Sequence, residues 1–287
     1  MSEFKPLRSV LYMPSSNERA LEKAKTIAAD AIIFDLEDAV APDAKPAARE
    51  AAAAAVQSGE YGRRHLIIRV NGIGTEWHDD DIEVAAAAGP DVVLVPKVNS
   101  AEEVLQLVDA LAAAGAPERT KLWAMVETPI GMLNALSIAT ASERLTGFVM
   151  GTNDLVKELY AEHVPGRAPI LPSLHTTLLA GRAAGIAVID GVYNDVKDVD
   201  GFLAECEQGR QMGFDGKTLI HPGQVEGANT AFAPSEKTVA DAQGLIEAFE
   251  SSTGGVVTYN GRMVENLHVE SAKRTLSIAE AIEGLNA

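Results

Sequence analysis

Short apolar runs rich in β-branched residues recur along the chain, and each is followed by a longer Ala-, Leu- and Glu-rich stretch with helical spacing. Strand–helix alternation repeated eight times predicts an α/β fold of the TIM (β/α)8 barrel type, and a doubly wound open sheet is the structural alternative. The runs that predict strands are Ser9–Met13, Ala31–Asp35, His65–Val70, Val92–Pro96, Lys121–Val126, Gly147–Met150, Ile186–Asp190 and Gly216–Ile220.

The chain continues well past the last predicted strand. Glu236–Ser251 reads as an amphipathic helix, the Gly-rich segment Thr253–Gly261 contains a short strand pattern at Val256–Tyr259, and Asn266–Gly284 reads as a final helix. We therefore predict a barrel over residues 1–233 and a carboxyl-terminal helical extension over 234–287. This extension would serve as a lid over a site, as an arm at a subunit interface, or as both.

The charge balance narrows the choice of partners. The sequence has 24 basic and 41 acidic residues and a formal net charge of -17, which disfavours general attraction to nucleic acid or to an anionic membrane surface. Any anionic ligand must therefore find a local basic patch.

Three absences point to the compartment. The chain has a single cysteine, Cys206, so it forms no internal disulfide. No apolar run approaches the ~20 residues that span a bilayer, and Met1 to Ser9 is too polar for a signal peptide. We expect a cytoplasmic protein without a membrane partner.

Polar residues cluster where the predicted strands end, and barrel enzymes carry their catalytic groups at the carboxyl ends of the strands. Taken singly, some of them have simpler explanations: Thr128 can cap a helix beside Glu127, Asp154 can be a turn or capping residue, and Asp38 a solvated loop acid. The strand-end set is Asp35, Glu37 and Asp38, then Arg69 and Asn71, then Lys97, Glu127, Gly151 to Asp154, and His221.

Together these residue types suggest a metal and a carboxylate ligand. Carboxylates from two strands, completed by water and ligand oxygens, are the usual ligands of Mg²⁺. Arg69 would offer its planar fork to a substrate carboxylate, since a buried guanidinium needs an anionic partner. Glycines at Gly131 and Gly151 would let backbone N–H groups approach the same ligand. A metal beside an arginine suggests a 2-oxo acid.

The same residues carry a family resemblance. The chain resembles the citrate lyase β-subunit-like family of CoA ester lyases, which includes malyl-CoA lyases within the HpcH/HpaI aldolase superfamily, and the resemblance covers nearly its whole length. The motifs that carry it, in order, are SVLYMP from Ser9, DLEDAVAP from Asp35 with Lys45, Arg69-Val70-Asn71, Val95-Pro96-Lys97, Glu127-Thr128-Pro129, GTNDL from Gly151, and Ile220-His221-Pro222.

The resemblance implies a role for each matched residue. Members of the family are TIM barrels, usually trimers or hexamers, that hold Mg²⁺ with a Glu and an Asp, which here would be Glu127 and Asp154. Arg69 would grip the oxo-acid carboxylate, with Gly151, Thr152 and Asn153 beside it in substrate binding. Glu37 and Asp38 would hydrogen-bond metal-bound waters. Coenzyme A, as part of the substrate, would meet Asn17, Arg19, Lys23 and His221.

One segment departs from the family pattern. Malyl-CoA and citramalyl-CoA lyases of this group carry a lid Asp that reaches into a neighbouring subunit's site, and the matching stretch here, Gly261 to Glu265, ends in Glu. Glu265 is one methylene longer and is the candidate acid or base. The change leaves open that hydrolysis of the thioester is favoured over cleavage.

The function that follows is a magnesium-dependent carbon–carbon lyase. It would cleave a 3-hydroxyacyl-CoA such as malyl-CoA into acetyl-CoA and a 2-oxo acid such as glyoxylate by retro-Claisen chemistry, or run the reverse condensation. Three alternatives stay open: a malyl-CoA thioesterase on the same metal site, a Schiff-base aldolase using Lys97 or Lys217 at a strand end, and a non-catalytic accessory subunit of a citrate lyase-like complex.

Overall fold

The computed structural model describes residues 5–252 and 257–286. The contacts of the chain divide it into a barrel unit, residues 7–232, and a carboxyl-terminal unit formed mainly by residues 233–287. In the described ranges no helix is both long and apolar enough to cross a bilayer.

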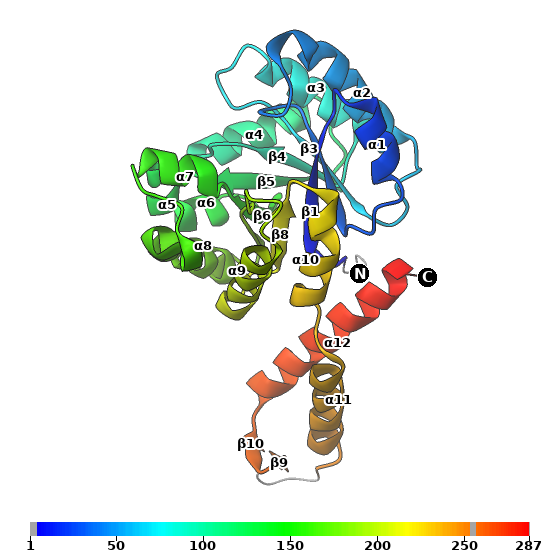
Figure 1. The fold of residues 1–287 in the computed structure, drawn as a ribbon, viewed down its shortest axis with the longest axis vertical. Helices are drawn as coiled ribbons and strands as arrows, with labels where there is room; N and C mark the ends of the chain where they lie inside the picture. Colours follow the sequence, from blue (N-terminus) through cyan, green and yellow to red (C-terminus); the bar gives the residue numbers. More distant parts are fainter. Residues whose placement is uncertain (1–4, 253–256, 287) are drawn as a thin grey trace. The chain divides into compact units, whose positions relative to one another are not determined.

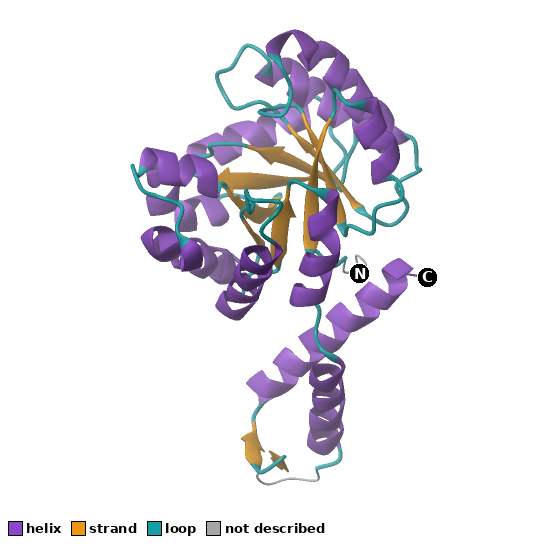
Figure 2. Ribbon diagram, in the orientation of Figure 1, coloured by secondary structure: helices purple, strands orange, loops and turns teal. Residues whose placement is uncertain are grey.

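Eight parallel strands close into a barrel, in which each strand pairs with the next along the chain and β8 pairs with β1 (Figures 1 and 2). This confirms the predicted (β/α)8 barrel and excludes the open sheet. The largest boundary difference is at β6, which begins two residues earlier than predicted. The strands are β1 (Ser9–Pro14), β2 (Ala31–Asp35), β3 (His65–Arg69), β4 (Val92–Val95), β5 (Lys121–Val126), β6 (Leu145–Met150), β7 (Ala187–Asp190) and β8 (Gly216–Leu219).

Helices surround these strands, and most of the apolar core lies between the two layers (Figure 2). Several helices begin at side-chain caps, such as Asn17 before α1 and Ser100 before α4, which explains where they start. The helices of this unit are α1 (Glu18–Ala24), η1 (Pro42–Ala44), α2 (Lys45–Gln57), α3 (His78–Ala88), α4 (Ala101–Ala113), α5 (Pro129–Leu133), α6 (Ala135–Ala139), α7 (Thr152–Glu158), η2 (Pro165–Ile170), α8 (Leu171–Ala184), α9 (Val199–Met212), η3 (Pro222–Gln224) and α10 (Val225–Phe232).

A second, smaller apolar cluster fills the inside of the barrel. Val10, Ile33, Ile67 and Trp123 belong to it, each from a different strand. Because side chains alternate along a strand, the residues two positions further on face the same interior. Tyr12, Asp35, Arg69 and Met125 are those residues, and Glu127 continues the series beyond β5. The barrel interior therefore becomes polar at the carboxyl ends of its strands.

Between β7, β8 and α9 lies a cluster of four charges, of which all but Glu205 are buried. Asp190 accepts hydrogen bonds from Nη1 of Arg167 at 2.6 and 2.8 Å and from Nζ of Lys217 at 3.2 Å. Lys217 also donates to Glu205 at 2.7 Å. The prediction that Lys217 stands at a strand end is wrong, because it is the second residue of β8 and contacts α9. We call Arg167, Asp190, Glu205 and Lys217 the β7–β8 charge cluster.

The carboxyl-terminal unit contains α11 (Glu236–Glu250), an antiparallel hairpin of β9 (Val257–Tyr259) and β10 (Arg262–Val264), and α12 (Asn266–Asn286), with α11 and α12 packed together. The two predicted helices are confirmed, and β10 is an element that the sequence analysis missed. Residues 253–256 lie outside the described residues, so the predicted strand pattern can be compared only from Val257 onward. Asn260 and Gly261 form the hairpin turn, both with positive φ.

Candidate active site

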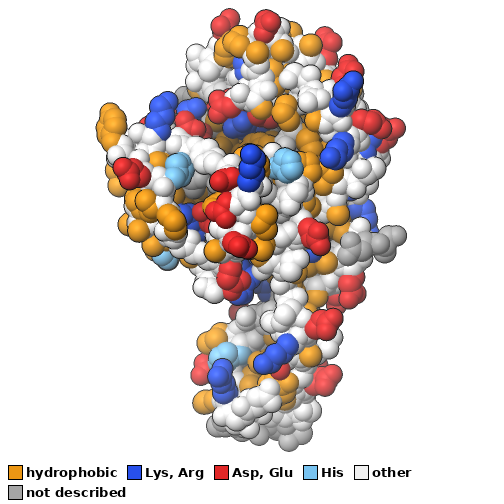
Figure 3. Space-filling view, viewed as in Figure 1, with side chains coloured by type: hydrophobic (Ala, Val, Ile, Leu, Met, Phe, Trp, Pro, Cys, Tyr) orange, Lys and Arg blue, Asp and Glu red, His pale blue; other side chains and the backbone are white. Residues whose placement is uncertain are grey.

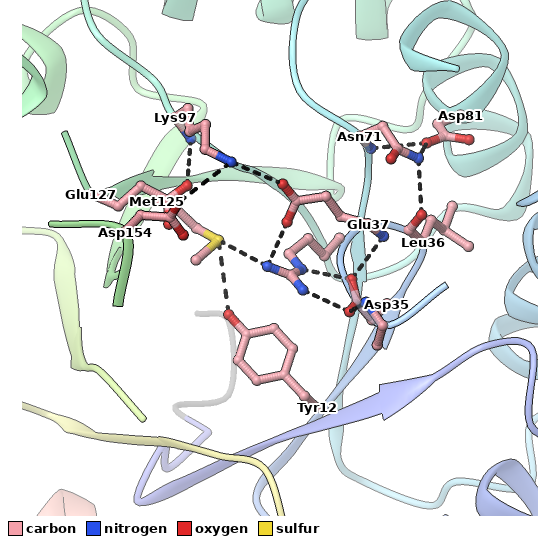
Figure 4. A network of polar contacts seen from close by, with 12 residues as sticks. Tyr12, Asp35, Leu36, Glu37, Asn71, Asp81, Lys97, Met125, Glu127 and Asp154 are labelled. Atoms are coloured by element: carbon pink, nitrogen blue, oxygen red, sulfur yellow. Dashed lines mark hydrogen bonds and ion pairs between the residues drawn. The ribbon is translucent and has the colours of Figure 1, made fainter. Parts of the chain in front are cut away.

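An arginine and an aspartate face each other at the ends of β2 and β3. Arg69 donates from Nε and Nη2 to the two carboxylate oxygens of Asp35, at 2.6 Å each, and both side chains are buried (Figure 4). Sequence analysis expected the fork of Arg69 to grip a substrate carboxylate. In the structure that edge of the guanidinium is occupied by Asp35, so Nη1 and the outer side of Nη2 are what remain for other partners.

Asp35 also shapes the turn that carries the next acid. Its carboxylate accepts the backbone N–H groups of Glu37 at 2.9 Å and Ala39 at 3.1 Å. Glu37 then reaches back to pair with Nη1 of Arg69 at 2.6 Å. Burial raises the pKa of the Glu37 carboxyl above its ordinary value, although Arg69 opposes the shift. Asp38, the neighbouring acid, is exposed.

A second set of polar contacts, made by Lys45 and Asn71, holds the turn that follows β2. Lys45, which is 4% exposed, donates to the backbone oxygens of Leu36 at 2.8 Å and Glu37 at 3.0 Å and to the side chain of Asn71 at 2.8 Å. Asn71 is held in turn by the buried Asp81 at 2.6 Å. The segment that presents Glu37 is therefore fixed through its backbone.

Glu127 follows β5 and is only 2% exposed. A Cβ on Gly151 would lie 2.0 Å from Glu127 Oε2, so only glycine at 151 leaves room for this carboxylate. Its Oε1 accepts the backbone N–H of Lys97 at 2.8 Å. Burial, followed by the charges of Asp154 and Glu37, raises the pKa of Glu127 to about 8.

Asp154 lies in the first turn of α7, where the helix dipole favours a negative charge. The ammonium of Lys97 lies 3.7 Å from Asp154 Oδ1 and 3.5 Å from Glu37 Oε1, and so stands between the two acids (Figure 4). Burial lowers the pKa of Lys97, but Glu37, Glu127 and Asp154 raise it by more, so the net pKa is above its ordinary value. Sequence analysis named Lys97 as a strand-end residue and a possible Schiff-base nucleophile, and the structure shows it as a carboxylate partner.

The predicted acids therefore come together at one end of the barrel. Glu37, Glu127 and Asp154 all interact with Lys97, and Asp38 adds to its field. Among the described residues, no three His, Cys, Asp or Glu side chains are arranged so that they alone could hold a metal ion. A metal bound by Glu127 and Asp154 would take its other ligands from water or substrate.

Tyr12 lies on β1, inside the barrel and against the guanidinium of Arg69. The guanidinium of Arg69 lies over its ring at 4.8 Å, and its hydroxyl is 3.8 Å from Met125 Sδ (Figure 4). Burial raises the pKa of Tyr12 above its ordinary value, so its hydroxyl keeps its proton. Tyr12 and Asp35 are two site residues to which sequence analysis assigned no role, although inward alternation from Val10 and Ile33 would have pointed to them.

Gly151 after β6 and Gly131 in α5 both leave space that a Cβ would fill. The N–H of Gly151 donates to the Val126 carbonyl at 3.3 Å and that of Gly131 donates to Thr128 Oγ1 at 3.0 Å. The expectation that these amides are available to a substrate is therefore corrected. Thr152 is buried at the start of α7. The exposed Asn153 exchanges two hydrogen bonds with Asn194, at 3.0 and 2.8 Å.

The residues predicted to meet coenzyme A are all exposed and lie on two segments. Arg19 and Lys23 are on α1, and Asn17 caps that helix by accepting the N–H of Ala20 at 3.1 Å. His221 caps η3 through the N–H of Gly223 at 3.0 Å. On the face drawn in Figure 3, basic and acidic side chains are interspersed, so positive charge is available only locally.

A cavity of about 450 Å³ opens between the segments that follow β6 and β7. Its lining includes Thr152 from the strand-end set, together with His163, Arg167 and Tyr193, but not Glu127 or Asp154. It therefore adjoins the acids without enclosing them.

Glu265 belongs to the carboxyl-terminal unit. It follows β10, is exposed, and its backbone N–H donates to Nδ1 of His268 at 2.9 Å. Its carboxylate therefore stands at the start of α12 and faces solvent.

A closed parallel barrel with acids and an arginine at the carboxyl-terminal ends of its strands has the arrangement of a TIM-barrel enzyme. Residues 8–222 match the family model described as HpcH/HpaI aldolase/citrate lyase, and residues 168–282 match the model of a C–C bond lyase of the TIM-barrel fold. The chain belongs to the HpcH/HpaI aldolase/citrate lyase family, as the sequence motifs predicted.

Individual relatives narrow the comparison. The chain is 53% identical over 285 residues to a (3S)-malyl-CoA thioesterase of Cereibacter sphaeroides, and the match covers 98% of each protein. It is 38% identical over 281 residues to the citrate lyase β subunit of Escherichia coli, covering 95% of this chain and 93% of that one.

A solved structure resembles the fold along most of the chain. It is the CitE protein of Mycobacterium tuberculosis in complex with magnesium, acetoacetate and coenzyme A. It aligns with a TM-score of 0.77 at 31% identity and covers 96% of this chain and 98% of that one.

Proposed function

We propose that this protein is a magnesium-dependent enzyme that hydrolyses a 3-hydroxyacyl-CoA of the malyl-CoA type to the free acid and coenzyme A. The observation that carries the proposal is the full-length 53% identity to (3S)-malyl-CoA thioesterases, combined with the acids and arginine assembled at the barrel end. The proposed substrate class follows from the activity for which those relatives are named.

Glu127 and Asp154 would hold the metal. The buried carboxyl of Glu127, with its pKa raised to about 8 by burial and by Asp154 and Glu37, is a poorly stabilised anion that a divalent cation would stabilise. The space that Gly151 leaves for this carboxylate fits the same role. Mg²⁺ supplies Lewis-acid polarisation of substrate oxygens when bound. The related CitE protein is described in complex with magnesium.

Arg69 and Glu37 would position the acid end of the substrate and the reacting water. Arg69, held by Asp35, keeps Nη1 and the outer side of Nη2 toward the site, where a substrate carboxylate would compete with Glu37. A displaced Glu37 carboxylate would accept a proton from water that attacks the thioester carbonyl. The bond that forms is carbon–oxygen, and the bond that breaks is carbon–sulfur, with the thiolate of coenzyme A leaving.

Carbon–carbon cleavage is the second candidate, and a specific observation favours it. Residues 168–282 match the model of a C–C bond lyase, and the citrate lyase β subunit is 38% identical over nearly the whole chain. In this reaction the bond to the hydroxyl-bearing carbon would break, the hydroxyl proton would pass to a base, and the acetyl-CoA enolate would take up a proton. Glu265, from the lid of a neighbouring chain, is the proposed acid and base.

The other two alternatives have less support. A Schiff-base nucleophile must lose its proton, whereas the pKa of Lys97 is raised by the acids around it and Lys217 is fully buried in ion pairs with Asp190 and Glu205. An accessory subunit would not need the buried acids, arginine and supporting contacts described above.

Binding of the rest of the substrate and assembly complete the proposal. We propose that coenzyme A phosphates contact the exposed Arg19 and Lys23 on α1, which supply local positive charge in an acidic protein. Asn17 and His221 are the other two proposed contacts. We propose a cytoplasmic homotrimer or homohexamer in which the unit that carries Glu265 closes over a neighbouring site.

The deciding experiment is a chromatographic product assay with malyl-CoA, run with Mg²⁺ and again with EDTA, on the unchanged protein and on the E127Q variant. Metal-dependent malate and free coenzyme A would support hydrolysis. Acetyl-CoA and glyoxylate in equal amounts would move the assignment to cleavage. Equal turnover in EDTA, or full activity of E127Q, would overturn the metal site.

A further inference from the structure

Lys97 contributes to the acid cluster in two separate ways. Its backbone N–H donates to Glu127 Oε1 at 2.8 Å, from a residue whose φ is 53°, in the left-handed region. Its side chain leaves in another direction and places the ammonium between Glu37 and Asp154 (Figure 4). The first contact belongs to the backbone and does not depend on which side chain stands at 97.

The ammonium of Lys97 is the cation that lies beside the proposed metal ligands. Arg69, the neighbouring cation, is committed to Asp35 and Glu37 by contacts of 2.6 Å. Asp154 is contacted by Lys97, and the charge of Lys97 also acts on Glu127. In the metal-free protein, Lys97 is therefore the counter-ion of Asp154, one of the two carboxylates proposed to hold magnesium, and its charge also reaches the other, Glu127.

This counter-ion is weakly held. Its distances of 3.5 Å to Glu37 and 3.7 Å to Asp154 are long for ion pairs, and its side chain is 42% exposed. Lysine carries a compact, strongly hydrated charge on a flexible stem, so the ammonium can move into solvent at small cost. Arg69, with a side chain only 9% exposed, is fixed by comparison.

We propose that Lys97 is an exchangeable counter-ion of the metal site, which occupies the carboxylates in the metal-free protein and is displaced when a divalent cation binds to them. The inference rests on the metal site proposed above and adds a residue that sets its affinity. A cation bound to Asp154 and Glu127 would repel an ammonium this close. The repulsion from Lys97 therefore lowers the affinity of the site for a divalent cation.

The proposal predicts the direction of a substitution. Replacing Lys97 by a neutral residue removes the repulsion but keeps the backbone hydrogen bond to Glu127, so the affinity for Mg²⁺ should rise. The variants K97M and K97Q should bind Mg²⁺ of the order of tenfold more tightly than the unchanged protein. K97R keeps the charge and should bind within about twofold of it.

Isothermal titration of each full-length variant with MgCl₂ provides the test, and no activity is measured. Equal or weaker binding in K97M and K97Q would overturn the proposal. E127Q serves as the reference for a damaged site. If the unchanged protein shows no binding above that of E127Q, the metal site itself fails. If it binds and the neutral variants do not bind more tightly, only the role of Lys97 fails.

A second measurement uses the unchanged protein. Acetylation of Lys97 by a mild amine-reactive ester, followed by peptide mass spectrometry, reports how free the amine is. Saturating Mg²⁺ should raise the labelling rate at Lys97 several-fold, because the displaced amine leaves its carboxylate partners and becomes more accessible to the reagent. The exposed Lys23 on α1 is the internal control and should be unaffected. An unchanged or lower rate at Lys97 would contradict displacement.

Discussion

Asp35 and Arg69 are register partners at the ends of the adjacent strands β2 and β3, and they share two hydrogen bonds of 2.6 Å inside the barrel. The guanidinium is thereby fixed at both Nε and Nη2 before any ligand arrives. Because Asp35 also holds the turn that presents Glu37, one buried carboxylate positions both the arginine and the acid that pairs with it.

The D35N substitution should therefore damage stability and turnover together. Removing one partner of a buried ion pair leaves an uncompensated charge, so the free energy of unfolding should fall by about 3 kcal/mol. A loosened Arg69 should lower kcat/KM about a hundredfold. Urea unfolding and steady-state kinetics measure the two effects. D43N, at an exposed acid of η1, is the control, and a D35N variant as active as D43N would contradict the positioning role.

The raised pKa of Glu127 predicts how stability depends on pH in the metal-free protein. Glu127 ionises near its ordinary 4.5 when unfolded but at about 8 when folded, so between these values the folded state holds the extra proton. The contribution of this group to the free energy of unfolding is therefore full below pH 4.5 and is lost as the pH rises through 8.

E127Q should remove this loss. In EDTA at pH 8.5 it should be more stable than the unchanged protein by the order of 3 kcal/mol, and the difference should shrink toward pH 5. Urea unfolding at the two pH values measures it, with E143Q, at an exposed acid, as the control. A difference between E127Q and the unchanged protein that does not vary with pH would refute the assignment.

Gly151 gives a steric test of the site. An alanine Cβ there would lie 2.0 Å from Glu127 Oε2 and 2.4 Å from its Cβ, so the glutamate must move. We expect G151A to lose about 2 kcal/mol of stability through overpacking and to weaken Mg²⁺ binding about a hundredfold in a calorimetric titration. G72A is the matched control, because its Cβ would meet Pro96 Cγ at an ordinary 3.7 Å. Equal Mg²⁺ affinity in the two variants would show that the position of Glu127 does not matter.

A mixing experiment tests the role of Glu265. E127Q would lack a metal ligand and E265A the acid and base proposed for carbon–carbon cleavage, so each alone should be nearly inactive in a cleavage assay. If Glu265 serves a neighbouring subunit, coexpressed chains that mix at random should recover about a quarter of the activity, since half of the sites keep Glu127 and half of those receive Glu265. Mixed oligomers that form but remain inactive would place Glu265 in the site of its own chain or outside the mechanism.

The apolar runs were enough to predict the barrel and most strand boundaries, because eight buried parallel strands read as eight short apolar segments. The buried position of Lys217 could not be predicted in this way. Its charge is neutralised by Asp190 and Glu205, and no local sequence pattern reveals these contacts. β10 was missed although Asn260-Gly261 is a strong two-residue hairpin signal. A three-residue strand gives too short an alternation to be noticed.

Sequence analysis predicted the acids of the candidate site, but not the contacts between its residues. Glu37, Glu127 and Asp154 follow strands and are visible as such, whereas the pairing of Asp35 with Arg69 depends on the register of β2 against β3. The position of Lys97 depends on a backbone in the left-handed region, which non-glycine residues seldom adopt and sequence does not announce. Tyr12 required knowing which face of β1 turns inward.

The β7–β8 charge cluster also restricts how this sequence can change over time. Asp190 and Lys217 are both fully buried, and Asp190 is bonded to Arg167 and Lys217 at once. Losing any one charge strands another in a dry interior, whereas replacing the set with apolar residues of similar volume can be neutral. In homologues, these four positions should therefore either all be charged or all be replaced by apolar residues. Homologues with three of the four charges should be rare.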